Sequence, residues 1–288
     1  MFTVTECNGA IATVELVDTA SQSRAVLAPS RGGLMTRLTL GGRELMYLDE
    51  ATFLDWKSNV RGGCPVLFPS PGKLAGDAWA RDGRAGSMKQ HGFARNLAWE
   101  STRRSTDGGA SVTLSLTSSD ATRAQYPWDF AAEFTYTLSA AALRIEQRFT
   151  NLSNTSMPFG AGFHPYFHVP EAEKAGARIV TDATRAFDNA AKQEVMLGAG
   201  IDLTQNEVDL HLWDHGRSSA ELTRPGAPTV RLSGSPEFTH WVVWTLKGRD
   251  FVCLEPWTCP GNALNTGDRL LVLGPGESRM LSLEIASG

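Results

Sequence analysis

Cysteine is scarce in this sequence and follows no regular spacing. The 288 residues include four cysteines, Cys7, Cys64, Cys253 and Cys259, and no Cys-x-x-Cys pair. Structural metal sites and disulfide frameworks depend on regular cysteine spacing, so neither is predicted. Scattered thiols are typical of a reducing compartment, and we expect a cytoplasmic location.

The sequence also lacks long apolar runs and a strong excess of charge of one sign. No run approaches the ~18 apolar residues that a membrane helix needs, and the first residues have neither the basic nor the apolar region of a signal peptide. The formal net charge is −4, with no cluster of Lys and Arg. We therefore expect neither a nucleic-acid nor a membrane partner. A ligand with a single phosphate is not excluded, and a monomer and a homodimer both stay open.

Motifs for several common chemistries are missing. There is no Walker loop and no Gly-x-Ser-x-Gly elbow, and Gly160-Ala-Gly162 lacks the third glycine of a dinucleotide site. Two histidine pairs have i, i+4 spacing, His164 with His168 and His211 with His215. Pro165 makes a helix unsuitable for the first pair, and in a strand such residues lie ~13 Å apart. No metal site is predicted.

What the sequence does contain is a large number of short strand-like segments. Apolar and polar residues alternate with period 2, which is typical of half-buried strands. The clearest segments are 12–17, 111–116, 133–138, 143–149, 241–244, 251–254, 270–273 and 280–285. The connection Ser139–Ala142 is of hairpin type, and only Pro170–Ala175 favours a turn of helix.

Frequent turns and the absence of a linker or an internal repeat indicate one all-β domain over residues 1–288. We expect a large antiparallel β-sandwich, although a barrel fits the same pattern. The Gly/Pro-rich segment from Phe68 to Gly86 is predicted to be a long surface loop of the kind that often carries function.

Two titratable residues stand in unusually apolar, aromatic settings. His164 lies in Gly160-Ala-Gly-Phe-His-Pro-Tyr-Phe167, and Glu255 lies in Phe251-Val-Cys-Leu-Glu-Pro-Trp257. Burial lowers the pKa of an imidazole and raises that of a carboxyl group, which brings both toward neutral pH. A proline follows each residue and favours extended geometry before it. The two are a candidate acid–base couple, although buried structural residues would give the same pattern.

Residues suited to holding a sugar occur elsewhere in the chain. Trp241, Trp244 and Trp257 lie near Glu255 in sequence and offer flat faces for stacking on a pyranose ring, although tryptophan also fills cores. The segments Arg61-Gly-Gly63 and His91-Gly-Phe-Ala-Arg95 flank the Gly/Pro-rich segment. Their guanidinium groups could bind hydroxyls or a phosphate, or could simply lie on the surface.

Four segments together resemble the aldose 1-epimerase (mutarotase) family. They occur in the family's order and span most of the chain: Arg61-Gly-Gly-Cys-Pro-Val-Leu-Phe-Pro69, Gln90-His-Gly-Phe-Ala-Arg95, Gly162-Phe-His-Pro-Tyr-Phe167 and Cys253-Leu-Glu-Pro-Trp257. The resemblance implies a large β-sandwich, a sugar bound in a cleft on one sheet, and no metal or organic cofactor.

The resemblance also implies roles for individual residues. Glu255 matches the family's general base and His164 its general acid, His91 a second histidine that holds the sugar, and Arg61 a substrate-contacting arginine. An aspartate on a later strand binds hydroxyls in the family; Asp209 is the better match and Asp214 competes. The expected reaction opens the ring of an aldohexose and recloses it on the other face, and so exchanges its α and β anomers.

Three alternatives remain at this stage. The Arg-Gly-Gly and His-Gly-Phe-Ala-Arg pattern resembles the hexose-6-phosphate branch, in which Arg61 and Arg95 would bind phosphate. The segment after Phe68 lacks an aromatic residue expected for that branch, however. A non-catalytic carbohydrate-binding module would bind sugar without accelerating its reaction. A glycosidase would pair Glu255 with Asp209 or Asp214 at ~5–9.5 Å.

Overall fold

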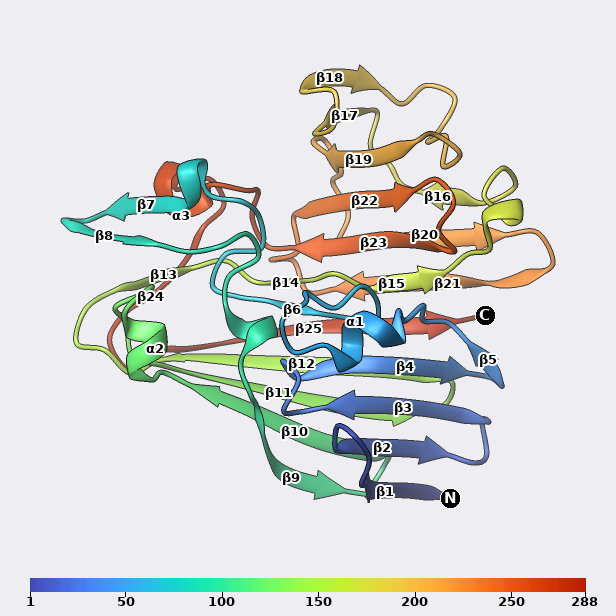
Figure 1. Cartoon of the computed structure of the whole chain (residues 1–288), viewed down its shortest axis with the longest axis horizontal. Coiled ribbons are helices and arrows are strands. Elements are labelled where there is room, and N and C mark those ends of the chain that lie inside the picture. Colours follow the sequence, from blue (N-terminus) through green and yellow to red (C-terminus); the bar gives the residue numbers. More distant parts are fainter.

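The computed structural model describes residues 1–288, and strands dominate it (Figure 1). The strands pair in antiparallel fashion and form a large sandwich, as predicted. The organisation as one domain stays a prediction. No helix is both long and apolar enough to cross a membrane.

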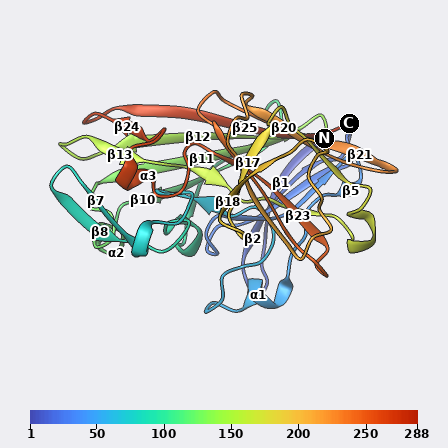
Figure 2. The ribbon, with the colours of Figure 1, turned by 90° about the horizontal axis from the view of Figure 1, so that it is seen from above.

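One layer of the sandwich is a sheet of eight strands. Seen from above, β12 and β25 run along one side of the molecule, and β1, β2 and β23 lie toward the other (Figure 2). In spatial order the sheet contains β16 (Arg178–Val180), β20 (Ser219–Arg224), β21 (Ala227–Gly234), β25 (Ser278–Ser287), β12 (Ala142–Asn151), β11 (Phe130–Ser139), β10 (Ala110–Thr117) and β9 (Glu100–Ser105).

Two further sheets make up the other layer. The first contains β1 (Phe2–Cys7), β2 (Thr13–Asp18), β3 (Ser23–Ala28), β4 (Leu34–Leu40) and β5 (Arg43–Glu44). The second contains β18 (Gln193–Met196), β17 (Arg185–Asp188), β19 (Glu207–Leu212), β22 (His240–Leu246), β23 (Phe251–Trp257), β14 (Gly162–Phe163) and β6 (Val66–Leu67), with β15 (Tyr166–His168) also paired to β23. Isolated bridges from Met35 to Cys64 and from Met46 to Phe167 connect these two sheets.

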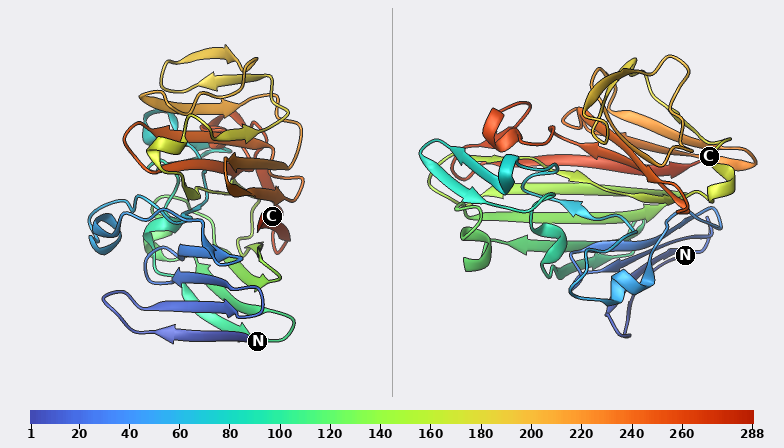
Figure 3. Two further views of the ribbon diagram at one scale, coloured as in Figure 1. Left: turned by 90° about the vertical axis from the view of Figure 1, so that its right-hand side faces the viewer. Right: turned by 45° about the horizontal axis from the view of Figure 1, so that its top comes forward.

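The remaining elements are short. The helix α1 (Glu50–Leu54) projects from the sheets (Figure 3), whereas α3 (Ala263–Thr266) lies beside the hairpin of β7 and β8 (Figure 1). The others are β7 (Ala78–Arg81), β8 (Arg84–Ser87), β13 (Met157–Phe159), β24 (Leu271–Leu273), α2 (Asp120–Arg123), and the 3₁₀ turns η1 (Ala75–Asp77), η2 (Ala94–Asn96) and η3 (Glu171–Glu173).

The period-2 patterns place the core between the layers. Along β11 every second residue from Phe130 to Leu138 is buried, and the residues between are half-exposed. A two-residue turn joins β11 to β12, because Ser139 pairs with Ala142. The turn residues Ala140 and Ala141 have φ values of 49° and 58°, as the right-handed twist of a two-residue hairpin requires.

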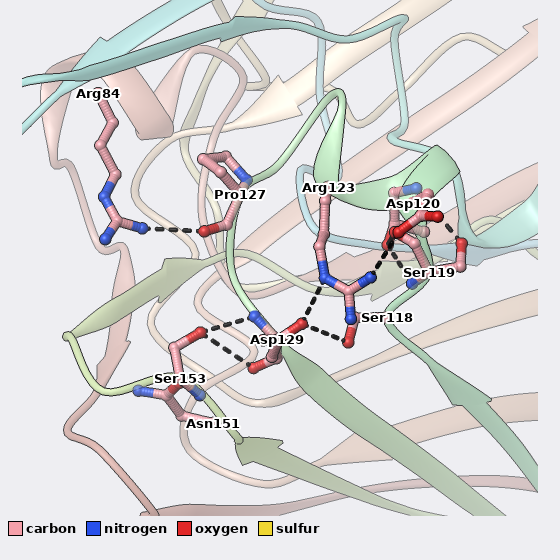
Figure 4. A network of polar contacts seen from close by, with 10 residues as sticks. Arg84, Ser118, Ser119, Asp120, Arg123, Pro127, Asp129, Asn151 and Ser153 are labelled. Carbon is pink, nitrogen blue, oxygen red and sulfur yellow. Dashed lines mark hydrogen bonds and ion pairs between the residues drawn. The ribbon is translucent and has the colours of Figure 1, made fainter.

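Polar contacts close the end of the sandwich near α2 (Figure 4). The guanidinium of Arg123 bonds Asp129 Oδ1 at 2.7 Å, and the Asp129 amide donates to Ser153 Oγ at 2.6 Å. Asn151 is fully buried, and its side-chain amide donates to three main-chain carbonyls between 2.8 and 3.0 Å. Asn151 therefore joins the end of β12 to two neighbouring segments of main chain.

The prediction of a long surface loop over residues 68–86 was wrong in part: no strand lies within residues 68–77, and Lys73, Ala75 and Gly76 are exposed. Residues 78–87 form the β7–β8 hairpin, and Ser70, Leu74 and Trp79 are buried rather than exposed on a loop. Trp79 packs on Trp128 with ring centroids 5.4 Å apart. This apolar contact fixes the Gly/Pro-rich segment against the rest of the protein. The predicted helical turn after Pro170 is present as η3.

Candidate active site

A cleft of about 500 Å³ lies over β19, β22 and β23. In β22 the residues Trp241 and Val243 face the core, whereas Val242 and Trp244 line the cleft. Because side chains alternate along a strand, the neighbouring strands contribute to the cleft in the same way. The antiparallel register places Val242 between His211 of β19 and Glu255 of β23.

His164 and Glu255, which are 255 − 164 = 91 residues apart, meet at the floor of this cleft. The distance from His164 Nε2 to Glu255 Oε1 is 3.4 Å, and only 9% and 2% of the two side chains are exposed. The indole of Trp257 donates to Glu255 Oε2 at 3.2 Å, and the ring of Tyr166 stacks on His164 at 4.7 Å. Each residue of the pair therefore has a second contact that fixes its side chain: Trp257 for Glu255 and Tyr166 for His164.

Burial shifts both groups in the direction predicted from their sequence settings. Loss of solvent raises the pKa of Glu255 well above its usual value, and the nearby Asp209 adds to this effect. Loss of solvent also lowers the pKa of His164, and His91 and Arg95 reinforce it. The site therefore favours uncharged forms of both residues.

His91 is held in an unusual backbone conformation next to this pair. Its φ is 72°, a left-handed value that costs a non-glycine residue ~1–2 kcal/mol. The Nδ1–H group bonds the carbonyl of Pro71, and burial lowers the pKa of His91 to about 3. The ring is therefore neutral, and its Nε2 is left as a hydrogen-bond acceptor. A Cβ on the next residue, Gly92, would lie 2.1 Å from the Phe68 carbonyl oxygen, which explains the glycine there.

The structure brings all of the predicted site residues to one cleft: Arg61, His91, Arg95, His164, Asp209, Glu255 and Trp257. The competing aspartate, Asp214, lies elsewhere. It accepts hydrogen bonds from the main chain at Thr184 and Arg185, and the bond from the Thr184 hydroxyl is the main reason that its pKa falls to about 2. Asp214 therefore holds a turn, and Asp209 is the candidate for hydroxyl binding.

The structure corrects the expectation for Trp241 and shows where the spaced histidines lie. Trp241, considered as a stacking face, is fully buried in the core. The spaced histidines do not converge: His168 is exposed, and His215 lies outside the cleft, with its Nδ1 2.7 Å from Asp182 Oδ1. A different group of three residues does bring possible metal-ligating atoms within 4.8 Å of one another: His164, Cys253 and Glu255. Burial raises the pKa of the Cys253 thiol, which disfavours the thiolate that a metal would need.

Sequence reasoning missed several residues that line the cleft. His211 had been considered only as part of a metal pair, although its spacing of two from Asp209 places both on one face of β19. Gln90 and Tyr166 lie within the segments that carry the family resemblance, but no role was predicted for them. The others lie in loops or at the start of β19 and have no sequence signal that relates them to the pair. The further lining residues include Asn59, Lys73, Gln90, Tyr166, Asn189, Lys192 and Glu207.

The sequence model of one family, aldose 1-epimerase, matches residues 15–286. The chain belongs to the aldose 1-epimerase family. The match includes every segment of the cleft described above and agrees with the resemblance first seen in four short motifs.

Solved structures share the aldose 1-epimerase family fold over the whole chain. The Slr1438 protein of Synechocystis sp. PCC 6803 has a TM-score of 0.94 at 36% sequence identity, covering 100% of this chain and 99% of that one. A galactose mutarotase-like protein from Clostridium acetobutylicum has a TM-score of 0.86 at 17% identity, covering 100% and 98%. At 17% identity the likeness concerns the fold alone.

A curated relative from Salmonella typhimurium carries the name "Putative glucose-6-phosphate 1-epimerase". It is 26% identical over 178 residues, which are 61% of this chain and 55% of that protein. The chain thus matches little more than half the length of this relative.

In this member of the aldose 1-epimerase family, Arg31 supports the loop that carries Arg61. Its buried guanidinium donates to four main-chain carbonyls within residues 52–58, at 2.7 to 3.2 Å. Arg31→Ala is expected to lower the free energy of unfolding by about 3 kcal/mol, because it leaves several acceptors unpaired. We also expect KM to rise about tenfold as the loop loosens.

Chemical denaturation and steady-state kinetics measure the two effects of Arg31→Ala. Arg31→Lys is the matched control: it keeps the charge but not the planar fork, so we expect an intermediate result. An Arg31→Ala protein with unchanged KM would show that Arg31 does not position the loop.

Proposed function

We propose that this chain interconverts the α and β anomers of an aldohexose through acid–base opening and reclosure of the sugar ring. The observation that carries this proposal is the contact of 3.4 Å between His164 Nε2 and Glu255 Oε1 at the floor of a polar cleft. In the proposed reaction Glu255 takes the proton of the anomeric hydroxyl while His164 protonates the ring oxygen. Rotation about C1–C2 and closure with reversed roles then invert C1.

Proton counting supports these roles. Charged His164 with ionised Glu255 carries the same number of protons as neutral His164 with protonated Glu255. Ring opening converts the first state into the second, and reclosure restores the first. Burial disfavours the charged form that opening starts from and favours the neutral form that opening produces. The environment therefore stabilises the open-chain stage of the reaction.

Measurement of optical rotation after mixing with freshly dissolved α-glucose, α-galactose or glucose 6-phosphate tests the proposal. We expect equilibration faster than in buffer for at least one of these sugars. Absence of acceleration for all three, together with binding of a sugar, would favour the carbohydrate-binding module. Release of reducing sugar from a glycoside would favour the glycosidase.

A hexose 6-phosphate is the second candidate substrate, favoured by a group of positively charged side chains in the cleft. Arg61, Lys73 and Arg95 line the cleft, and none of them forms an ion pair. Arg95 Nε is buried without a hydrogen-bond partner. Burial chiefly, and repulsion from Arg61 as well, lower the pKa of Arg95. A phosphate would neutralise this cluster and accept its hydrogen bonds, and the name of the Salmonella relative agrees with such a substrate.

The phosphate proposal predicts a substrate-dependent effect. Arg61→Met and Arg95→Met are each expected to raise KM for glucose 6-phosphate by about 10- to 100-fold, the loss of one charge-assisted interaction. KM for free glucose should change less than about threefold. Arg148→Met, on the exposed face of β12, is the control for loss of one positive charge. Equal effects on both sugars would assign the arginines to hydroxyl binding instead.

A further inference from the structure

One buried histidine beside the cleft has no part in the proposed chemistry. His240 begins β22, is 1% exposed and does not line the cleft. Its Nε2 lies 2.7 Å from Nδ1 of His211, which does line the cleft. Its Nδ1 lies 3.4 Å from a guanidinium nitrogen of Arg269. Arg269, His240 and His211 thus form a row that leads from the protein surface into the cleft.

The row has only one consistent arrangement of protons. A guanidinium can donate but not accept, so His240 Nδ1 accepts from Arg269. Burial lowers the pKa of His240 well below its usual value, and His211 and Arg269 reinforce the shift, so the ring is neutral. Its single proton therefore sits on Nε2 and is donated to His211 Nδ1. Burial also lowers the pKa of His211, so the one proton of that ring is on Nε2.

His211 Nε2 is the atom that faces Asp209. The distance to Asp209 Oδ1 is 3.6 Å, too long for a good direct hydrogen bond. The other carboxylate oxygen of Asp209 accepts a bond from Asn189 at 2.6 Å. A group placed about 2.8 Å from both His211 Nε2 and Asp209 Oδ1 would receive a hydrogen bond from the first and give one to the second. A hydroxyl group has this combination of donor and acceptor.

We propose that Arg269 and His240 are positioning residues that hold His211 as a hydrogen-bond donor, so that His211 and Asp209 together bind one hydroxyl group of the substrate. This inference rests on the proposed function, because it takes the ligand to be a sugar. It assigns His211 to binding and excludes it as a base, since no free lone pair faces the cleft. His91 complements it, because its Nε2 is an acceptor.

The position of Arg269 is itself well defined. Another guanidinium nitrogen of Arg269 donates to the carbonyl of Thr239 at 2.8 Å, directly before His240. Arg269 also has a φ of 52°, a left-handed backbone value that is unfavourable for arginine. Contacts with the Thr239 carbonyl and with His240 therefore fix the guanidinium of Arg269 at the start of the row.

Long-range ¹H–¹⁵N spectra of histidine-labelled protein without sugar test the row directly. We expect His211 and His240 each to show one protonated Nε2 and one unprotonated Nδ1, with His211→Asn used to assign the signals. A proton on Nδ1 of His211 would overturn the proposal. This readout needs no activity, so it is independent of whether the chain is an epimerase.

Kinetics with paired variants test the consequence for binding. His240→Leu is expected to raise KM about tenfold and to leave kcat within a factor of about two, whereas His240→Gln keeps an N–H near the same place and should restore most of the loss. Arg269→Met and Arg269→Lys form a second pair on a partly exposed side chain, in case the buried Leu variant does not fold. We expect Arg269→Met to populate both tautomers of His211 and to raise KM several-fold.

Two kinetic outcomes would overturn the proposal. If kcat fell while KM stayed constant, His211 would act in the chemistry rather than in binding. If His240→Leu and His240→Gln, both folded, had equal effects, the donor from His240 would be irrelevant. Should no sugar prove to be a substrate, shifts of the His211 signals on titration with glucose replace KM as the measure, and their absence would refute the hydroxyl site.

Discussion

Glu255→Gln is expected to lower kcat for anomer interconversion by a factor on the order of 10²–10⁴, the usual contribution of a positioned acid–base group. Glutamine has nearly the same shape as glutamate. It can still accept the hydrogen bond that the Trp257 indole donates to Glu255 at 3.2 Å in the unaltered protein. It cannot take the proton of the anomeric hydroxyl. KM should change little, so polarimetric progress curves at saturating sugar measure the effect.

The same substitution is expected to stabilise the protein. Burial raises the folded-state pKa of Glu255, and for a carboxyl group shifted upward the folded state loses stability as pH rises above the unfolded value of ~4.5. Glutamine removes that cost, so the free energy of unfolding at pH 7 should rise by about 1–3 kcal/mol. Denaturation at pH 4.5 and pH 7 measures the difference, which should be larger at pH 7.

The combination of lost activity and gained stability separates a catalytic role from a structural one. Glu146→Gln, on β12 of the opposite layer, is the matched control and should change neither quantity appreciably. A Glu255→Gln protein that is both stable and fully active would remove Glu255 from the mechanism. One that is destabilised would indicate a structural carboxylate.

The alternation of apolar and polar residues predicted much of the fold. Segments 111–116, 133–138 and 143–149 lie within β10, β11 and β12, because each has one face on the core and one toward solvent. The hairpin at Ser139–Ala142 was predicted from its length alone. Pairing between sheets was not predictable, since it depends on contacts between residues far apart in the sequence.

The site was predictable only in part, for the same reason. His164 and Glu255 stood out because each lies in an apolar, aromatic segment. Trp241 and Trp244 could not be told apart until the register showed which of them faces the cleft. His211 was missed because its partner His240 is 29 residues away and is joined to it by strand pairing. The Gly/Pro-rich segment was predicted to be a surface loop because the contact that buries Trp79 comes from Trp128, which is far away in the sequence.

His164→Asn is expected to lower kcat by a factor on the order of 10²–10⁴ and to change the pH profile, because asparagine cannot protonate the ring oxygen. In the unaltered protein the active pair holds one proton between its two members. A second proton goes to His164, whose pKa burial lowers, so activity should be lost only well below pH ~6.5. Loss of the shared proton at higher pH should lower the activity again, which gives the pH profile a second, alkaline limb.

With asparagine at this position only Glu255 titrates, and it must be ionised to act as the base. The acid limb of kcat/KM then follows the pKa of Glu255, which burial raises, so this limb should move to higher pH than in the unaltered protein. The alkaline limb should disappear, because no shared proton remains to be lost. Rates of optical rotation across pH 4–10 measure both changes. An unshifted acid limb would mean that a residue other than His164 shares the proton with Glu255, and His91, whose ring centroid lies 5.4 Å from that of His164, would be the next to replace.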